Sequence, residues 1–298
     1  MTSTPASLAD LYIPEGVGRT ALFIAWQRHA ESIRPDALFR DPLADWVTGT
    51  LAEHPVMAHC TQMVREVLGE KPRYPDYFTV RTRFFDDRIM AALHDGVHQI
   101  VTLAGGLDGR PFRLACPPDA RWFEIDLPDM CRFKQSITHL AGLRAACRWQ
   151  PVAADLTGDW PATLAAAGFD PALPTVWLIE GLFMYLTDAQ GDALLTTVRR
   201  AAAPGSLLLI EHLQASMLGE PGRWARERVE SQGARWLSAR DDLERWLAGH
   251  GWVAEVHAGD DPAIGLGRSV GPVPAAWLAA ATPVRVDVSS GPAARSVR

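Results

Sequence analysis

A glycine-containing turn and an acidic residue on the next apolar segment are the first features able to bind a ligand. Residues 98–104, HQIVTLA, lead into Ala104, Gly105 and Gly106, where the backbone can approach a ligand closely. The next apolar run ends at Asp126, twenty positions after Gly106. A carboxylate at this spacing can accept hydrogen bonds from both hydroxyls of a ribose. The spacing therefore indicates an adenosine-containing cofactor.

Two further apolar runs end in residues that suit the same pocket. Residues 147–155 end at Asp155, which is followed by Leu156, and this pair could flank an adenine ring and bond its amino group. Residues 175–181 contain Glu180, a carboxylate that needs a positive or hydrogen-bonding partner when buried. The ammonium of a methionine moiety would be such a partner.

These residues need a sheet whose strands end at one edge. Short apolar runs alternate with helical or loop segments, which predicts right-handed crossovers and a mainly parallel sheet. The five expected strands are residues 98–104, 121–126, 147–155, 175–181 and 206–212, and a further strand is expected at 252–258.

Helical patterns surround these strands. Residues 17–68 have helical apolar spacing interrupted by prolines, and residues 78–96 predict one long helix. Residues 188–205 predict a helix between the fourth and fifth strands, and residues 213–236 predict a helical insertion after the fifth. That insertion is longer than a crossover needs and could cover a substrate site.

The turn by itself leaves two cofactors open, a nicotinamide dinucleotide and S-adenosylmethionine. Both use a glycine turn followed by an acid on the second strand. Two observations favour S-adenosylmethionine: Ala104 replaces the first glycine of the GxGxxG pattern, and a long helical segment precedes the turn.

Six ordered motifs carry a family resemblance between about Gly18 and His212. They are RHAES with RPDALFRDPLA, VRTRFFDD, LAGGLDGRPFRL, FEIDLP, AADL and IEGLFMYL. In these the sequence resembles the leucine carboxyl methyltransferase superfamily, including bacterial members related to the tetracenomycin polyketide carboxyl O-methyltransferase. The resemblance implies a class I methyltransferase fold, a doubly wound, Rossmann-like α/β structure with a helical N-terminal cap, and S-adenosylmethionine as cofactor.

The resemblance also implies the residues that contact the cofactor, namely Arg81, Ala104, Gly105, Gly106, Asp126, Asp155, Leu156 and Glu180. Arg81 would bind the methionyl carboxylate, because a guanidinium can grip a carboxylate with two parallel hydrogen bonds. Asp126 would hold the ribose, Asp155 and Leu156 the adenine, and Glu180 the methionyl amine. The family usually has GAGLDTR where this chain has AGGLDGR, so we expect the first glycine's role to pass to Gly105 or to weaken.

The acceptor decides whether methyl transfer needs a general base. A carboxylate, with a pKa of about 4, is ionised at neutral pH, whereas a phenol, with a pKa of about 10, benefits from proton removal. His212 ends the fifth expected strand and Tyr185 lies in GLFMYL, near the same sheet edge. We therefore expect His212 and Tyr185 to contact the acceptor, with His212 as base if a hydroxyl is methylated.

Composition limits the other classes of function. The net charge of −6 with scattered Lys and Arg argues against nucleic acid as a partner. The four cysteines form no CxxC pair, so we expect neither a metal site nor disulfides. The first residues lack a signal-peptide pattern and no apolar run reaches spanning length, which predicts a cytoplasmic protein without membrane contact.

The sequence thus predicts an S-adenosylmethionine-dependent O-methyltransferase acting on a small secondary metabolite such as a polyketide, preferably at a carboxylate. The acceptor is expected to be aromatic or to carry a carboxylate. A cap over residues 1–75, a cofactor-binding unit over 76–285 and a mobile tail over 286–298 are expected. Methylation of a protein's C-terminal carboxylate, an NAD-dependent oxidoreductase and a nucleotide-binding module without catalysis are the alternatives.

Overall fold

The computed structural model describes residues 11–14, 17–52, 76–270 and 275–284. Parts of the expected cap, and the whole of the expected tail at 286–298, lie outside these ranges. Within them, no helix is both long enough and apolar enough to cross a membrane.

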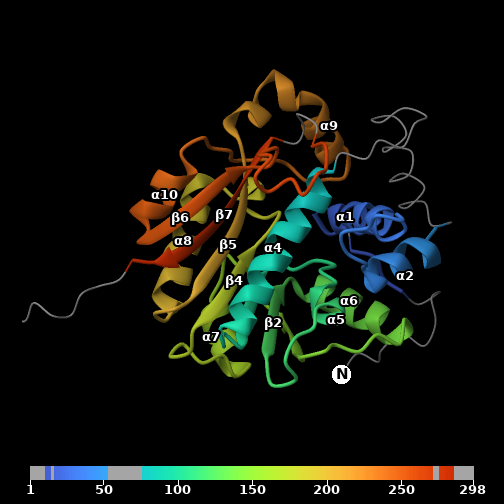
Figure 1. The fold of residues 1–298 in the computed structure, drawn as a ribbon, viewed down its shortest axis with the longest axis horizontal. Coiled ribbons are helices and arrows are strands. Elements are labelled where there is room, and N and C mark those ends of the chain that lie inside the picture. Colours follow the sequence, from blue (N-terminus) through green and yellow to red (C-terminus); the bar gives the residue numbers. More distant parts are fainter. Residues whose placement is uncertain (1–10, 15–16, 53–75, 271–274, 285–298) are drawn as a thin grey trace, which may run out of the picture.

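A seven-stranded sheet forms the centre of the molecule (Figure 1). Its order is β3-β2-β1-β4-β5-β7-β6, and β1 to β5 run parallel. The strands are β1 (Gln99–Leu103), β2 (Arg121–Asp126), β3 (Arg148–Ala153), β4 (Thr175–Ile179), β5 (Leu207–Leu213), β6 (Trp252–Ala258) and β7 (Ala276–Pro283). Because the order reverses between β1 and β4, the carboxyl ends of these two strands border a crevice suited to a ligand.

Helices cover both faces of the sheet, as the doubly wound fold requires. On one face the core joins the strands to α7 (Trp160–Ala166), α8 (Asp188–Ala201) and α10 (Leu243–Gly249). On the other face α4 (Tyr77–His94) packs through Phe84, Phe85 and Ile89. This double cover explains why β1 and β4 are fully buried and mostly apolar.

The N-terminal helices form a separate layer beside the turn after β1. The layer consists of α1 (Val17–Ser32) and α2 (Pro42–Thr50), which pack with Leu107 and with α6 (Pro128–Leu140). Asp41 caps α2 by accepting a hydrogen bond of 3.0 Å from the Ala44 N–H. A four-residue helix, α5 (Arg110–Arg113), follows the turn.

The insertion after β5 is helical, as predicted. It consists of η3 (Ala215–Leu218), η4 (Glu220–Gly222) and α9 (Arg223–Ser231). Between β4 and α8 lies the short helix η2 (Phe183–Tyr185), and α8 begins with a capping box in which Thr187 and Gln190 bond each other's backbone.

The sequence patterns did not reveal β7. Residues 276–283, AWLAAATP, are rich in alanine, which has a weak strand preference, so this segment lacks a strand signature. It becomes a strand because it fills the gap between β5 and β6, pairing antiparallel with both. Tertiary pairing thus overrides local preference here.

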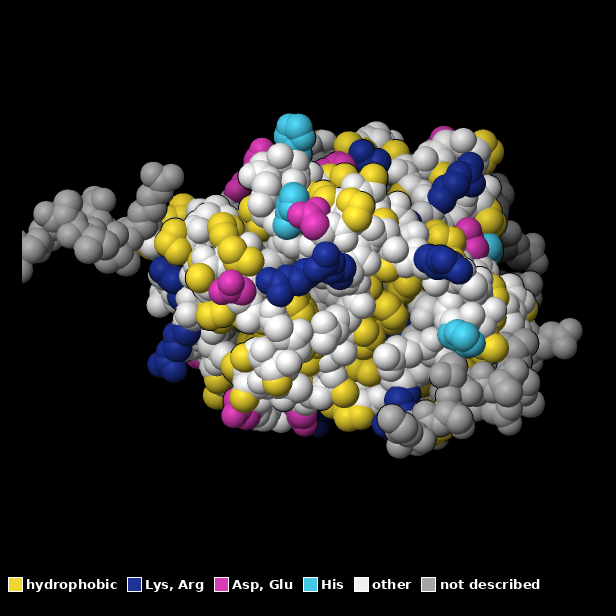
Figure 2. Space-filling model, turned by 90° about the horizontal axis from the view of Figure 1, so that it is seen from below, with side chains coloured by type: hydrophobic (Ala, Val, Ile, Leu, Met, Phe, Trp, Pro, Cys, Tyr) yellow, Lys and Arg dark blue, Asp and Glu magenta, His cyan; other side chains and the backbone are white. Residues whose placement is uncertain are grey.

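Charged side chains are dispersed on the face that Figure 2 shows, seen from below in the orientation of Figure 1. Acidic and basic groups lie there in small separate clusters among hydrophobic and neutral side chains. Among the described residues, this face has no continuous basic surface.

Candidate active site

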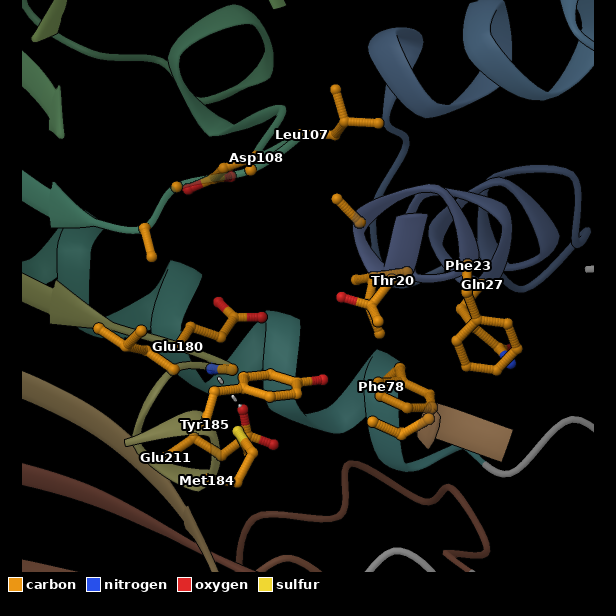
Figure 3. A pocket seen from close by; sticks show the side chains of 18 of the residues that line it. Thr20, Phe23, Gln27, Phe78, Leu107, Asp108, Glu180, Met184, Tyr185 and Glu211 are labelled. Atoms are coloured by element: carbon orange, nitrogen blue, oxygen red, sulfur yellow. Dashed lines mark hydrogen bonds between the residues drawn. The ribbon is translucent and has the colours of Figure 1, made fainter. Parts of the chain in front are cut away.

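A cavity of about 430 Å³ lies at the carboxyl ends of β1, β2, β4 and β5, between the sheet and helices α1 and α9. Figure 3 shows Glu180, Glu211 and Tyr185 on the sheet side, with Thr20 and Gln27 of α1 across from them. Predicted site residues that line the cavity are Arg81, Ala104, Gly105, Gly106, Asp126, Glu180 and Tyr185. The fold therefore brings most of the predicted site together.

The turn after β1 has a tightly curved backbone. Ala104 has φ 56° and Gly106 has φ 52°, both in the left-handed region. Ala104, which stands where the family usually has its first glycine, therefore adopts the left-handed conformation itself. The Ala104 N–H donates to the Ile125 carbonyl (2.8 Å), which fixes the turn against β2. The left-handed conformation of Ala104 costs roughly 1 kcal/mol of backbone strain.

Asp126 connects β2 to the turn. One carboxylate oxygen accepts from the Gly106 N–H (2.7 Å) and the other from the Leu127 N–H (2.8 Å). Burial raises the pKa of Asp126, and these two backbone donors counteract the rise only in part. Each oxygen still has lone-pair capacity for a hydroxyl donor. Asp126 is thus held in a fixed orientation at the cavity wall.

Arg81 lies between two carboxylates at the ends of β4 and β5. Its Nε is 2.9 Å from Glu180 Oε1, and its Nη1 is 2.8 Å from Glu211 Oε2. Burial alone would lower the pKa of Arg81, but Glu211 and Glu180 raise it above its ordinary value. Glu211 also accepts from the Tyr77 hydroxyl and from the Gly181 N–H. The guanidinium is therefore charged and held firmly in place.

A second buried arginine extends this network toward the turn. Arg110 Nη1 is 2.8 Å from Glu180 Oε2 and 3.1 Å from Asp108 Oδ2, while its Nε is 2.7 Å from Asp86 Oδ1. Glu180 is thus shared by Arg81 and Arg110. Buried charges of this kind persist only when they are paired in this way.

Tyr185 points across the cavity toward α1 (Figure 3). Burial raises the pKa of its hydroxyl, and interactions with Trp236 and Thr20 offset that rise only in part. The phenol is therefore protonated at neutral pH and able to donate a hydrogen bond.

The structure does not bring His212 to the cavity. Its imidazole is buried, stacked on Phe183 at 5.5 Å between ring centroids and edge-on to Trp246 at 5.7 Å. Because side chains alternate along a strand, Glu211 faces the cavity and His212 faces the opposite side of the sheet. Burial lowers the pKa of His212 to about 4.

Asp155 and Leu156 also lie outside the lining of the cavity. Asp155 is exposed and accepts from the N–H (2.8 Å) and the hydroxyl (2.7 Å) of Thr157, and these bonds lower its pKa. Leu156 packs against the core beside β3. Leu127, which lines the cavity and is 51% exposed, lies next to Asp126 instead.

Sequence reasoning missed five charged residues of the described cavity lining, namely Arg28, Asp108, Arg110, Glu211 and Arg228. Asp108 and Arg110 follow the turn in the quoted motif LDGR, and Glu211 interrupts the apolar run LLLIEHL as Glu180 interrupts its own. The signal that could have identified Glu211 is therefore a carboxylate that interrupts an apolar run.

Among the described residues, no group of three His, Cys, Asp or Glu side chains is arranged to hold a metal ion.

Comparisons with known proteins identify the family of this chain. A model of the family described as leucine carboxyl methyltransferase matches residues 21–199. A relative from Parafrankia sp. (strain EAN1pec), provisionally named an S-adenosyl-L-methionine-dependent methyltransferase, is 40% identical over 80% of this chain and 77% of its own. The chain belongs to the leucine carboxyl methyltransferase family. A Streptomyces coelicolor relative with the same provisional name is 38% identical over 88% of this chain and 92% of its own.

This membership assigns the chain to the S-adenosylmethionine-dependent methyltransferases. A solved structure of a DUF574 family protein from Streptomyces avermitilis superposes with a TM-score of 0.60 at 15% identity. The superposition covers 87% of this chain and 96% of that chain. That likeness concerns the fold, and it confirms the Rossmann-like α/β architecture predicted from the sequence.

The residues present fit S-adenosylmethionine chemically. Asp126 supplies acceptors for hydroxyls, Arg81 a guanidinium for a carboxylate, and Glu180 a carboxylate for an ammonium. A Cβ at Gly106 would lie 3.3 Å from Ala21 Cβ, so the glycine leaves room between the turn and α1. The cavity therefore offers groups complementary to the ribose hydroxyls, the carboxylate and the ammonium of the family's cofactor.

Proposed function

We propose that this family member transfers the methyl group of S-adenosylmethionine to a carboxylate oxygen of a small, apolar acid. A secondary metabolite such as a polyketide is the preferred acceptor, and a hydroxyl oxygen is the alternative. The observation that carries the proposal is the pairing of the cavity's two glutamates with an arginine. Glu180 and Glu211 are paired with Arg81, and Tyr185 keeps its proton, so these groups suit an acceptor that is already ionised.

The positive charge of the bound donor would attract an anionic acceptor. The sulfonium carries one positive charge beside the methyl group, and attraction between opposite charges is strong in a low-dielectric cavity.

The proposed donor contacts use the same walls of the cavity. Arg81 would orient the methionyl carboxylate, Glu180 the ammonium and Asp126 the ribose, while Ala104, Gly105 and Gly106 would let the backbone approach. Leu127, beside Asp126, is proposed to contact the adenine in place of Asp155 and Leu156.

The donor supplies an electrophilic methyl group. As the acceptor oxygen forms its bond to the methyl carbon, the bond from that carbon to sulfur breaks, and its electron pair stays on sulfur. A methyl ester and S-adenosylhomocysteine result, and a carboxylate acceptor releases no proton. The protein's part is alignment and exclusion of water, with Tyr185 placed to donate a hydrogen bond to the acceptor.

A matched pair of acceptors tests the proposal. Transfer of a radiolabelled methyl group would be measured with 2-naphthoic acid and with 2-naphthol, together with the proton released per turnover. The proposal expects turnover of the acid without proton release. Turnover of the naphthol alone, with one proton released, would favour hydroxyl methylation and contradict the carboxylate assignment.

A further inference from the structure

Helix α9 forms the outer wall of the cavity, and none of its residues is fully buried. Trp224, Ala225 and Val229 of this helix line the cavity, yet no side chain of α9 is buried. Trp224 is 41% exposed, although large apolar side chains usually gain by burial. The inner face of α9 is therefore an apolar surface turned toward a space that a ligand can fill.

The connectors of α9, together with a contact of Ala225 against the core, fix its position. Among the described elements, α9 packs mainly against η3 and η4. Arg226 donates to the carbonyls of Met217 and Gly219, both at 2.6 Å, and Met217 is fully buried. A Cβ at Gly222 would lie 2.0 Å from the Met217 carbonyl oxygen, so glycine is required where α9 begins. The helix is held at its base while its inner face is left for a ligand.

The opposite wall is also aromatic. Phe23 of α1 and Phe78 of α4 both line the cavity, and their rings meet edge to face at 5.9 Å between centroids. Figure 3 shows Phe23 and Phe78 on the side of the cavity away from Glu180, and Figure 1 places α9 near the start of α4. The cavity thus has a charged part at the strand ends and an aromatic part between α1, α4 and α9.

A cation borders the aromatic part. The Arg228 guanidinium lies 5.6 Å from the centre of the Trp224 ring, one helical turn along the same face. A flat apolar group that carries a negative charge could stack on the Trp224 ring and be attracted by the Arg228 guanidinium. The helix also lies beyond residues 21–199, the stretch that carries the family match.

We propose that the inner face of α9 selects the acceptor, with Trp224 as the residue that determines specificity for flat, aromatic acids. This inference rests on the proposed function, since it assigns the acceptor end of the same cavity. Trp224 would cover one face of the acceptor while Phe78 and Phe23 cover another, and Arg228 would favour the anion through its field.

Isothermal titration of the full chain tests the assignment, with 2-naphthoic acid as probe in the presence of saturating S-adenosylhomocysteine. Trp224→Ala is expected to weaken naphthoate binding more than tenfold, and Trp224→Phe to restore it to within threefold of the parent. The matched control Glu230→Ala, at an exposed position of α9 outside the cavity lining, is expected to leave it unchanged.

Binding of S-adenosylhomocysteine, measured separately, distinguishes the two levels of failure. Unchanged affinity for it in Trp224→Ala, within twofold, shows that the fold and donor site are intact. Equal naphthoate binding by Trp224→Ala and the parent, or no naphthoate binding by a parent that binds S-adenosylhomocysteine, overturns the role of Trp224. Loss of S-adenosylhomocysteine binding by the parent itself contradicts the proposed function instead.

Discussion

Ala104 holds a backbone conformation that glycine adopts at lower cost. Its φ of 56° is required by the turn that brings the chain from β1 toward the ligand, and a Cβ in this region is strained. Ala104→Gly is therefore expected to raise the free energy of unfolding by about 1 kcal/mol, measured by urea denaturation.

A matched substitution separates this effect from the general cost of glycine. Ala165→Gly, at an exposed position of α7, is expected to lower the free energy of unfolding by up to about 1 kcal/mol. Destabilisation of similar size by both substitutions would show that Ala104 carries no strain.

The buried His212 makes the protein sensitive to acid. Its pKa of about 4 in the folded state lies below the value of 6.5 for an unperturbed histidine. The unfolded chain therefore binds a proton first, and the free energy of unfolding falls as the pH drops from about 6.5 toward 4. The loss from this residue is at most about 3 kcal/mol.

Replacement of His212 by Asn tests both its burial and its distance from the cavity. The variant is expected to lose this part of the pH dependence between 6.5 and 4, seen in chemical denaturation at several pH values, while turnover per folded molecule stays within twofold. His98→Asn, at an exposed position, serves as control. A loss of turnover greater than tenfold in His212→Asn, but not in His98→Asn, would indicate that His212 acts as a general base after all.

At the level of elements, Gly109 allows the N-terminal helices to dock on the cofactor turn. A Cβ there would lie 2.2 Å from an Asp41 carboxylate oxygen, and Asp41 both caps α2 and pairs with Arg28 at 2.8 Å. Gly109→Ala must displace this buried carboxylate, so it is expected to lower the free energy of unfolding by about 3 kcal/mol.

Gly49 lies in α2, the helix that Asp41 caps, and provides the comparison for Gly109. No atom lies within 4 Å of the position a Cβ would take there, so Gly49→Ala is expected to stabilise the protein slightly. Calorimetric melting temperatures would show the contrast. If Gly109→Ala melts at the same temperature as the parent, Asp41 does not hold the cap against the turn.

The elements show what the sequence could and could not predict. Apolar runs predicted β1 to β6, because strands covered on both faces must be apolar, and the spacing from Gly106 to Asp126 predicted the turn and its carboxylate. The alanine-rich β7 was not predicted, because it is a strand only through its pairing with β5 and β6. The sequence did not show which face of β5 His212 and Glu211 each take, so it predicted His212 in the site and not Glu211. It also could not show that the Asp155 carboxylate bonds locally to Thr157 and lies outside the cavity lining.

For the whole molecule, the cavity joins residues from Gly18 of α1 to Trp236 beyond α9. Its walls come from three layers: the strand ends, the N-terminal helices and the insertion. Arg28 illustrates the coupling, since it donates to the Leu107 carbonyl of the turn while pairing with Asp41. Donor and acceptor sites are therefore expected to depend on one cooperative unit.

The central claim is that Asp126 and its neighbours form the donor site at this edge of the sheet. Isothermal titration with S-adenosylhomocysteine, comparing the parent, Asp126→Ala and Asp155→Ala, tests it most directly. We predict more than tenfold weaker binding for Asp126→Ala and a change of less than twofold for Asp155→Ala. Unchanged binding by Asp126→Ala, or no binding by the parent, would contradict the account.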